Sequence, residues 1–299
     1  MTTEFKNLLS PITIGGLTLR NRVVFLPHVT LYASRDHRPT ERLRDYYAER
    51  ARAGVGLIVS ESQTIHVSST CPRLVDASDL GRMLQWHDTI KACHDHGAKM
   101  FAQLTHHGNQ MFGGSGRLPL WAPSAIPDPV VREIPRPMEL EDIRTLVESF
   151  RVCAAHARGA GFDGVEIKVA HDGVLRQFLS PYSNRRDDHY GGSVENRVRI
   201  VLEVLQAVRG AVGSDFVVGL RLCLDEFIPG GYSLEDSREF AVAFAREGQI
   251  DYISADMGTF AALPMQIAPM VVPLGYAVYA VSAIKELVDV PVIAFGRIK

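Results

Sequence analysis

Two side chains at the end of one predicted strand are the best candidates for chemistry in this sequence. Residues 164–170 alternate apolar side chains with Glu166 and Lys168, which predicts a short buried strand, and His171 follows directly after it. An ammonium group and an imidazole can both donate hydrogen bonds to a substrate oxygen. A lysine removed from water can also act as a proton donor. We therefore take Lys168 and His171 as the candidate catalytic residues.

Polar residues also stand at the ends of the other predicted strands, where parallel barrels place their active sites. They are Pro27 and His28, Ser62, Gln103, Arg221, Asp256 and the pair Gly296-Arg297. A flavin requires such groups, because amides bind its pyrimidine edge and a cation stabilises the negative charge that develops near N1 and O2 on reduction. The set therefore favours a flavin site. His106 and His107 have no third ligand at a suitable spacing, so we expect no metal there.

Alternating strands and helices must position these residues. The patterns predict a hairpin over 12–19 and strands over 23–27, 56–60, 99–104, 165–170, 216–222, 252–255 and 292–294. Helices are predicted between the strands, over 40–53, 81–96, 140–158, 193–212, 234–247 and 276–288. Repeated βα units of this length predict a parallel sheet with right-handed crossovers. Periodicity alone leaves both a doubly wound open sheet and a (β/α)8 barrel open.

The number of strands decides whether the barrel can close. The sequence supplies seven barrel strands and stops at residues 296–299, before an eighth could begin. Closure would pair the missing strand with strands one and seven, so both would have unpaired edges. We therefore expect the functional protein to continue beyond residue 299, and the chain alone to bind its cofactor poorly and to aggregate.

Residues 161–197 read GFDGVEIKVAHDGVLRQFLSPYSNRRDDHYGGSVENR, which resembles the fourth-strand signature of the Old Yellow Enzyme family of FMN-dependent oxidoreductases. Further matches are N-R-V-V at 21–24, Q-L-T-H-H-G at 103–108, L-R-L followed by D-E at 220–226, and P-V-I-A-F-G-R at 291–297. The resemblance covers essentially the whole chain. It favours a TIM barrel, with residues 1–299 forming one FMN-binding domain that is incomplete at its C-terminal end.

The resemblance implies a role for each strand end. Pro27 and His28 would line the flavin through backbone groups, and Ser62 would lie near N5 and O4. Gln103 would bind the pyrimidine, and Arg221 would face N1 and O2. Gly296 and Arg297 would begin the FMN phosphate site. The Pro27-His28 pair is most similar to the branch that holds 2,4-dienoyl-CoA reductase and trimethylamine dehydrogenase. Val29 stands where the latter has its flavin-linked cysteine, so FMN would be bound without a covalent link.

Three residues depart from the family pattern near strand four. Lys168 replaces the first member of a histidine or asparagine pair that holds a substrate carbonyl, and only His171 of that pair is present. Gly173 replaces a tyrosine that donates a proton in many relatives, and Asp172 replaces the glycine before it. The donor is therefore expected to be solvent, Lys168 or a loop residue such as Tyr182. We leave open whether Lys168 lies in the site or forms a rim ion pair with Glu166 or Asp172.

The leading hypothesis is an FMN enzyme that takes hydride from NAD(P)H and passes it to an activated C=C bond, in an enone or an enoyl thioester. One alternative is an amine dehydrogenase of the trimethylamine type. Another is a lyase or aldolase barrel with Lys168 as the Schiff base, and a further one is a non-catalytic fragment. Relatives in this branch often add [4Fe–4S] and FAD-binding segments, which these residues do not contain.

The composition limits which partners and which cellular compartment the protein can have. The 299 residues carry a net charge near −2, which argues against a nucleic-acid partner, and no apolar run is long enough to cross a membrane. The N-terminus shows no signal-peptide pattern, and the four cysteines are far apart, so we expect free thiols in the cytoplasm. The expected partner is a small unsaturated molecule, and a homo-oligomer is left open. The Gly- and Pro-rich connection 105–138, with glycines at 113, 114 and 116, is expected to form a lid.

Overall fold

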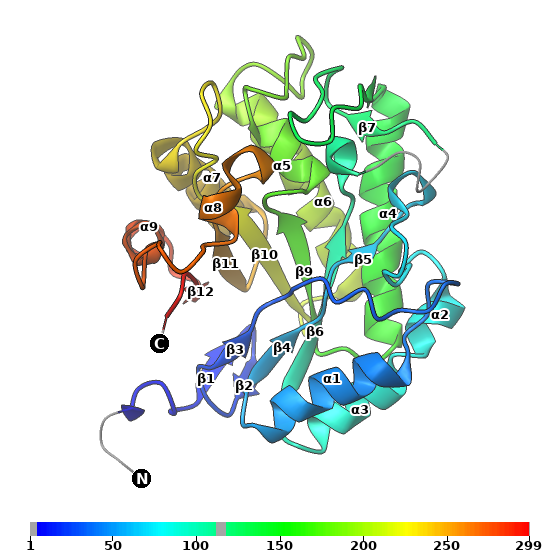
Figure 1. The fold of residues 1–299 in the computed structure, drawn as a ribbon, viewed down its shortest axis with the longest axis vertical. Coiled ribbons are helices and arrows are strands. Elements are labelled where there is room, and N and C mark those ends of the chain that lie inside the picture. The colour runs from blue at the N-terminus through cyan, green and yellow to red at the C-terminus, as the bar shows by residue number, and fades with distance from the viewer. Residues whose placement is uncertain (1–4, 112–117, 299) are drawn as a thin grey trace.

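The computed structural model describes residues 5–111 and 118–298. Its centre is a parallel sheet in the order β12-β11-β10-β9-β6-β4-β3, with β5 paired to β6 off this path. The sheet curls into a nearly closed barrel (Figure 1). Its strands are β3 (Val24–Phe25), β4 (Leu57–Val59), β5 (Gln63–Thr64), β6 (Lys99–Thr105), β9 (Gly164–Val169), β10 (Val217–Cys223), β11 (Tyr252–Asp256) and β12 (Val292–Ile293). The barrel and its seven-strand path are as the sequence predicts.

Helices cover the outside of the sheet (Figure 1). The longer ones are α1 (Glu41–Arg52), α3 (His87–His94), α4 (Leu140–Gly159), α6 (Val194–Val212), α7 (Leu234–Glu247) and α9 (Val278–Lys285). Thr40 and Ser193 cap α1 and α6 by accepting hydrogen bonds from backbone N–H groups three residues on. No helix among residues 5–111 and 118–298 is long and apolar enough to cross a membrane.

The prediction of one helix over 81–96 is wrong. The chain forms α2 (Leu80–Leu84) and then α3. Between them is a turn of 3-10 type, because the N–H groups of Gln85 and Trp86 donate to the carbonyl groups three residues earlier, those of Arg82 and Met83. This turn lets Trp86 become fully buried between Tyr47 and Phe162, with ring centroids 6.1 and 5.5 Å away. Tertiary burial therefore overrides the local helical pattern.

Several short elements were not predicted from the sequence. They are α5 (Val174–Leu179), α8 (Leu263–Gln266), the parallel pair β7 (Trp121–Ala122) and β8 (Arg136–Pro137), and 3-10 turns at Val67–Ser69, Gly108–Gln110 and Phe260–Ala262. Most of them lie in the loops at the carboxyl ends of the strands. The glycines expected to give the lid its flexibility, at 113, 114 and 116, lie outside the described residues.

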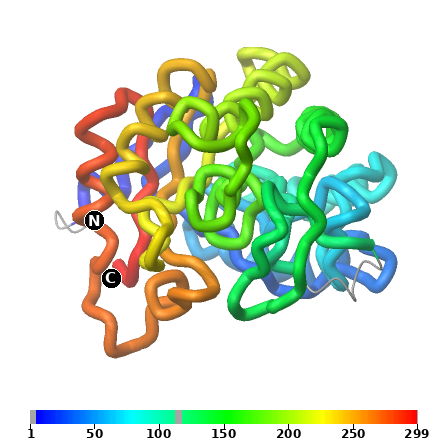
Figure 2. The backbone as a smooth tube through the Cα atoms, turned by 90° about the horizontal axis from the view of Figure 1, so that it is seen from above, coloured from blue at the N-terminus to red at the C-terminus, as the bar shows by residue number. Residues whose placement is uncertain are grey.

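The predicted hairpin closes the amino-terminal end of the barrel. It consists of β1 (Ile12–Ile14) and β2 (Leu17–Leu19). Ile14 and Leu19 pack inside the barrel in one apolar cluster with Leu57, Val59, Phe101, Val217 and Tyr252. Ile293 of β12 packs against this cluster too, so both ends of the chain contribute to it. Figure 2 shows them on the same side of the molecule.

Strand register assigns the inward-facing residues above this plug to two levels. Gln103, Glu166, Gly219 and Tyr252 lie side by side on β6, β9, β10 and β11. Two residues further along the strands, Lys168, Arg221 and Ser254 form the next level. Alternate residues such as Val165 and Ile167 pack outward against the helices. The barrel therefore presents one polar level above another at its carboxyl end.

Candidate active site

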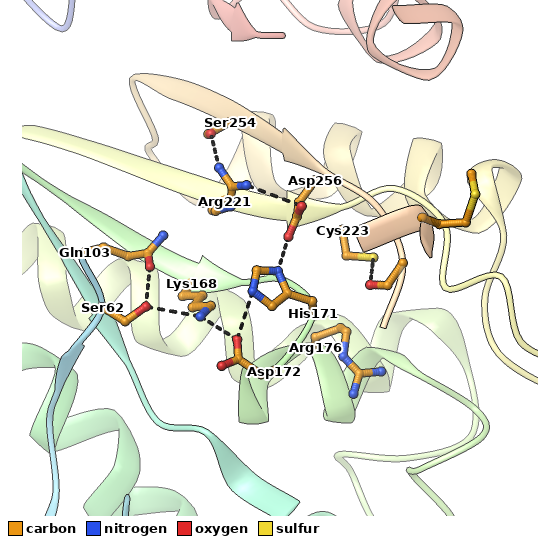
Figure 3. A network of polar contacts seen from close by, with 12 residues as sticks. Ser62, Gln103, Lys168, His171, Asp172, Arg176, Arg221, Cys223, Ser254 and Asp256 are labelled. Carbon is orange, nitrogen blue, oxygen red and sulfur yellow. Dashed lines mark hydrogen bonds and ion pairs between the residues drawn. The ribbon is translucent and has the colours of Figure 1, made fainter. Parts of the chain in front are cut away.

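Lys168 lies inside the barrel and takes part in a buried polar network (Figure 3). The residue is 3% exposed, and its Nζ donates to Ser62 Oγ over 3.1 Å and forms an ion pair with Asp172 Oδ1. Ser62 Oγ donates in turn to Gln103 Oε1 over 2.5 Å. Lys168 is thus part of the candidate site rather than a rim residue, and its acidic partner is Asp172 rather than Glu166.

Asp172 is the carboxylate that brings Lys168 and two histidines of this network together. Besides Lys168, it contacts His107 Nδ1 at 2.9 Å and His171 Nε2 at 3.2 Å. Burial alone would raise the pKa of Asp172, but Lys168, His171 and His107 outweigh it and hold that pKa well below its usual range. The two departures from the family pattern at 168 and 172 therefore compensate each other, because the buried lysine and the buried aspartate form one ion pair.

His171 joins this network to Arg221. Its Nδ1 contacts Asp256 Oδ2, and Asp256 Oδ1 lies 3.3 Å from Arg221 Nη2, while Arg221 Nη1 donates to Ser254 Oγ over 3.2 Å. Burial opposes the charge on Asp256, yet Arg221 and His171 lower its pKa. As Figure 3 shows, His171 lies between Asp256 and Asp172. The structure thus brings five predicted site residues into one connected cluster: Ser62, Gln103, Lys168, His171 and Arg221.

Gln103 contacts a buried acid as well. Its Nε2 donates to Glu166 Oε1 over 2.7 Å, and the hydroxyl of Tyr252 donates to Glu166 Oε2 over 3.0 Å. Burial raises the pKa of Glu166, although Arg221 and these two hydrogen bonds act in the opposite direction. Gln103 therefore has a donor and an acceptor in use, and each end of its amide retains further hydrogen-bonding capacity.

Three residues of the site were not predicted from the sequence as members of it, namely His107, Glu166 and Asp172, and a fourth, Asp256, was noted at a strand end without a role. All are at most 8% exposed, and all contact a predicted site residue or each other. Only their positions along the strands could have indicated that they belong to the site, since Glu166 alternates with outward apolar residues and Asp256 ends its strand. Their partners come from other strands, which no local pattern reveals.

The remaining predicted site residues lie apart from this cluster. The ring of His28 contacts the hydroxyl of Tyr46 on α1, at 3.1 Å from Nδ1 and 2.9 Å from Nε2, and burial lowers its pKa. The His28 ring is thus engaged with α1, and a flavin contact through backbone groups of Pro27 and His28 stays a prediction. Arg297 donates to the carbonyl groups of Pro269, Met270 and Val272. Gly296 has a φ of +107°, and a Cβ there would lie 2.9 Å from that of Ala277, so this turn requires glycine.

The two histidines after β6 contact the loops around them. His106 Nε2 contacts Ser68 Oγ at 2.9 Å and its ring stacks on Trp121 at 5.5 Å, while His107 contacts Asp172. Burial holds the pKa of His106 well below its usual value. Within the described part of the chain, no three His, Cys, Asp or Glu side chains are grouped so as to hold a metal ion.

The donor set can be compared with what FMN requires. A flavin pyrimidine presents carbonyl acceptors beside an N–H donor, and it develops negative charge near N1 and O2 on reduction. Gln103 retains one amide N–H and one carbonyl lone pair, and Arg221 places a buried cation one level above. These residues fit an FMN ring.

Comparison with known proteins agrees with this fit. The sequence profile of the NADH:flavin oxidoreductase / NADH oxidase family matches residues 7–299. Over 303 residues the chain is 36% identical to an NADH oxidase of Thermoanaerobacter brockii, with 99% of this chain and 46% of the relative covered. It is also 36% identical over 303 residues to an N,N-dimethylglycine/sarcosine dehydrogenase of Chromohalobacter salexigens, with 99% of this chain and 44% of the relative covered.

A solved structure of 2-naphthoyl-CoA reductase superimposes with a TM-score of 0.91 at 25% identity, covering 96% of this chain and 46% of the reductase. The chain thus spans less than half the length of these proteins. The profile match, the two relatives and the shared barrel agree with one another. The chain belongs to the NADH:flavin oxidoreductase / NADH oxidase family, the family of Old Yellow Enzyme.

Proposed function

We propose that this chain is the FMN-binding barrel of an enzyme that uses electrons from NAD(P)H to reduce an activated C=C bond. One observation carries the proposal. The groups suited to a flavin pyrimidine, Gln103 and Arg221, are joined through Ser62 and Asp256 to the groups suited to a substrate oxygen, Lys168 and His171. Cofactor and substrate sites would thus adjoin, as direct hydride transfer requires.

Bound FMN would accept hydride from the nicotinamide and deliver it to the substrate through N5. Gln103 would hold the pyrimidine by its remaining N–H and carbonyl lone pair, and Arg221 would stabilise negative charge at N1 and O2. Ser62 would lie beside the ring near N5 and O4. Gly296 and Arg297 would meet the phosphate. For this, the Arg297 side chain would exchange its carbonyl partners in the 269–272 segment for phosphate oxygens.

Lys168 would bind the carbonyl oxygen of the substrate, and His171 would join it by exchanging its 3.2 Å contact with Asp172 for the substrate oxygen. Of the three N–H groups of Lys168, one reaches Ser62 and one reaches Asp172, which leaves one for a substrate oxygen. A cation at this place withdraws electrons from the conjugated C=C bond and prepares it for hydride. Gly173 has no side chain to donate a proton, so solvent, Lys168 or a loop residue such as Tyr182 would supply it.

A second candidate function is amine oxidation, favoured by the 36% identity to a dimethylglycine/sarcosine dehydrogenase. A cationic amine would have to enter a site where Lys168 and Arg221 already place two buried cations. Their counter-ions Asp172 and Asp256 are already engaged. We therefore rank alkene reduction first. A Schiff-base lyase gains no support, since Lys168 is held in an ion pair within a flavoenzyme fold.

The test separates the two half-reactions in anaerobic stopped-flow experiments on the flavin-loaded protein. NADH or NADPH should bleach the flavin, and 2-cyclohexenone or an enoyl thioester should reoxidise it. Sarcosine or dimethylglycine should not bleach it. Bleaching by these amines without reoxidation by any enone would reverse our ranking. Full-length protein that takes up no FMN would refute the proposal as a whole.

We further propose that the enzyme works in the cytoplasm. All four cysteines are free, and Cys93, Cys153 and Cys223 are buried. A reducing compartment keeps such thiols reduced. Fractionation of cells that express the tagged protein would test this, and recovery in a secreted or membrane fraction would contradict it.

A further inference from the structure

A buried acid in the barrel takes part in no step of the proposed reaction. Glu166 is fully buried, and its two oxygens accept from Gln103 Nε2 at 2.7 Å and from the Tyr252 hydroxyl at 3.0 Å. Gln103 is 1% exposed and Tyr252 fully buried. The three side chains lie on one level of the barrel, and Lys168 and Arg221 lie on the next. A carboxyl group in such a place is costly to bury, so its partners need an explanation.

Tyr252 reaches Glu166 only because a glycine lies between them. On the sheet, Glu166 of β9 pairs with Gly219 of β10, and Gly219 pairs with Tyr252 of β11. A Cβ at Gly219 would lie 1.9 Å from Cε1 and 2.0 Å from Cζ of the tyrosine. The ring of Tyr252 therefore crosses β10 through the space that a side chain at 219 would fill. The glycine is required for the Tyr252–Glu166 hydrogen bond.

This bond determines which way the amide of Gln103 points. A glutamine amide has a donor end and an acceptor end that occupy nearly the same space. With the carbonyl turned toward the Glu166 carboxylate, two acceptor oxygens would face each other at a buried position. The NH2 group must therefore face Glu166 and the carbonyl must face Ser62, whose hydroxyl donates to it over 2.5 Å.

The orientation decides what the amide offers a ligand. The NH2 group keeps one free N–H and the carbonyl keeps one free lone pair, side by side. This pair matches a ring that presents a carbonyl oxygen next to an N–H, the arrangement at C2=O and N3–H of a flavin. With the amide reversed, its N–H would face the flavin N3–H and its carbonyl oxygen would face the flavin carbonyl oxygen.

We propose that Glu166 is a positioning residue which, held by Tyr252 across Gly219, fixes the Gln103 amide for recognition of the flavin N3–H and its neighbouring carbonyl. The inference rests on the proposed placement of FMN against Gln103. It adds to that placement a reason for the glutamic acid, the tyrosine and the glycine on one level of the barrel.

The test compares FMN with 3-methyl-FMN, which lacks the N3–H. Dissociation constants of both are measured by fluorescence titration of the full-length protein after its flavin has been removed. The unaltered protein should bind FMN more tightly by about tenfold, the size of one hydrogen bond. Glu166→Gln keeps the volume but offers both a donor and an acceptor, so Gln103 can adopt either orientation. The preference for FMN should then fall by at least about threefold.

Two further variants complete the experiment. Tyr252→Phe removes only the hydroxyl and should lower the preference in the same direction. Tyr190→Phe is the matched control, because it removes a similar tyrosine–glutamate bond, 3.0 Å to Glu203, outside the barrel. It should leave the preference unchanged. If Glu166→Gln does not fold, the preference measured for Tyr252→Phe tests the inference instead.

The outcomes separate this inference from the proposed function. If Gln103→Ala abolishes the preference while folded Glu166→Gln and Tyr252→Phe keep it in full, Glu166 does not position the amide and the inference is overturned. If Gln103→Ala itself leaves FMN binding and the preference unchanged, Gln103 does not contact the pyrimidine, and the proposed placement of the cofactor is wrong. If the preference for FMN falls in Gln103→Ala, Glu166→Gln and Tyr252→Phe, the result supports both the proposed cofactor placement and the positioning role of Glu166.

Discussion

Replacement of Asp172 by asparagine should destabilise the protein strongly. Asp172→Asn keeps the shape of the side chain but leaves the ammonium of Lys168, which is 3% exposed, without its carboxylate. Removing one partner of a buried ion pair costs about 3–5 kcal/mol. We expect a value near the lower end, about 3 kcal/mol, because Ser62 still accepts one of the lysine N–H groups.

The assay is urea unfolding at pH 7, combined with a double-mutant cycle. Lys168→Met removes the buried cation, so Asp172→Asn should cost much less in its presence. The coupling free energy should be about 1–3 kcal/mol. Asp215→Asn provides the control, since its ion pair with Arg158 is exposed and should contribute less than about 1 kcal/mol.

The effect should also depend on pH in a defined direction. Lys168, His171 and His107 hold the pKa of Asp172 well below its usual range. Its stabilising contribution is therefore fully present above the pKa of an unfolded aspartate, about 4, and is lost as the pH falls through the lower folded pKa. The stability difference between the unaltered protein and Asp172→Asn should shrink below about pH 4. A cost under about 1 kcal/mol with no coupling to Lys168 would refute the reasoning.

Three further predictions concern the cofactor, the substrate and the barrel. Arg221→Ala should weaken FMN binding and lower the flavin midpoint potential, with Arg221→Lys intermediate; unchanged flavin content and potential would contradict its placement. His171→Ala should slow reoxidation of the flavin by an enone at least about tenfold and leave its reduction by NAD(P)H nearly intact; loss of both half-reactions would indicate a folding role. Gly219→Ala should destabilise the protein by at least about 2 kcal/mol in urea unfolding, because the new Cβ meets the Tyr252 ring; an unchanged midpoint would exclude this crowding.

The sequence by itself determined the order of the elements and the family. The helix starts after Thr40 and Ser193 could be predicted, because a capping side chain acts on N–H groups only three residues away. The strand that carries Lys168 was predictable because apolar and polar residues alternate along it. The end of that strand made Lys168 and His171 candidate residues, and the long match over 161–197 indicated the family.

Only the tertiary structure decided which of these residues contact one another and which of them are buried. Asp172 appeared in the sequence as a departure from a pattern, and the structure made it the partner of Lys168 and of two histidines. Trp86 broke a helix that its local pattern favoured, since burial against Tyr47 and Phe162 outweighs helix continuity.

Glu166 meets Tyr252 from 86 positions away, through a gap left by Gly219. Such contacts depend on strand register and on which side chain points inward at each level. Both are set by how whole strands pair, and no local stretch of sequence contains that information.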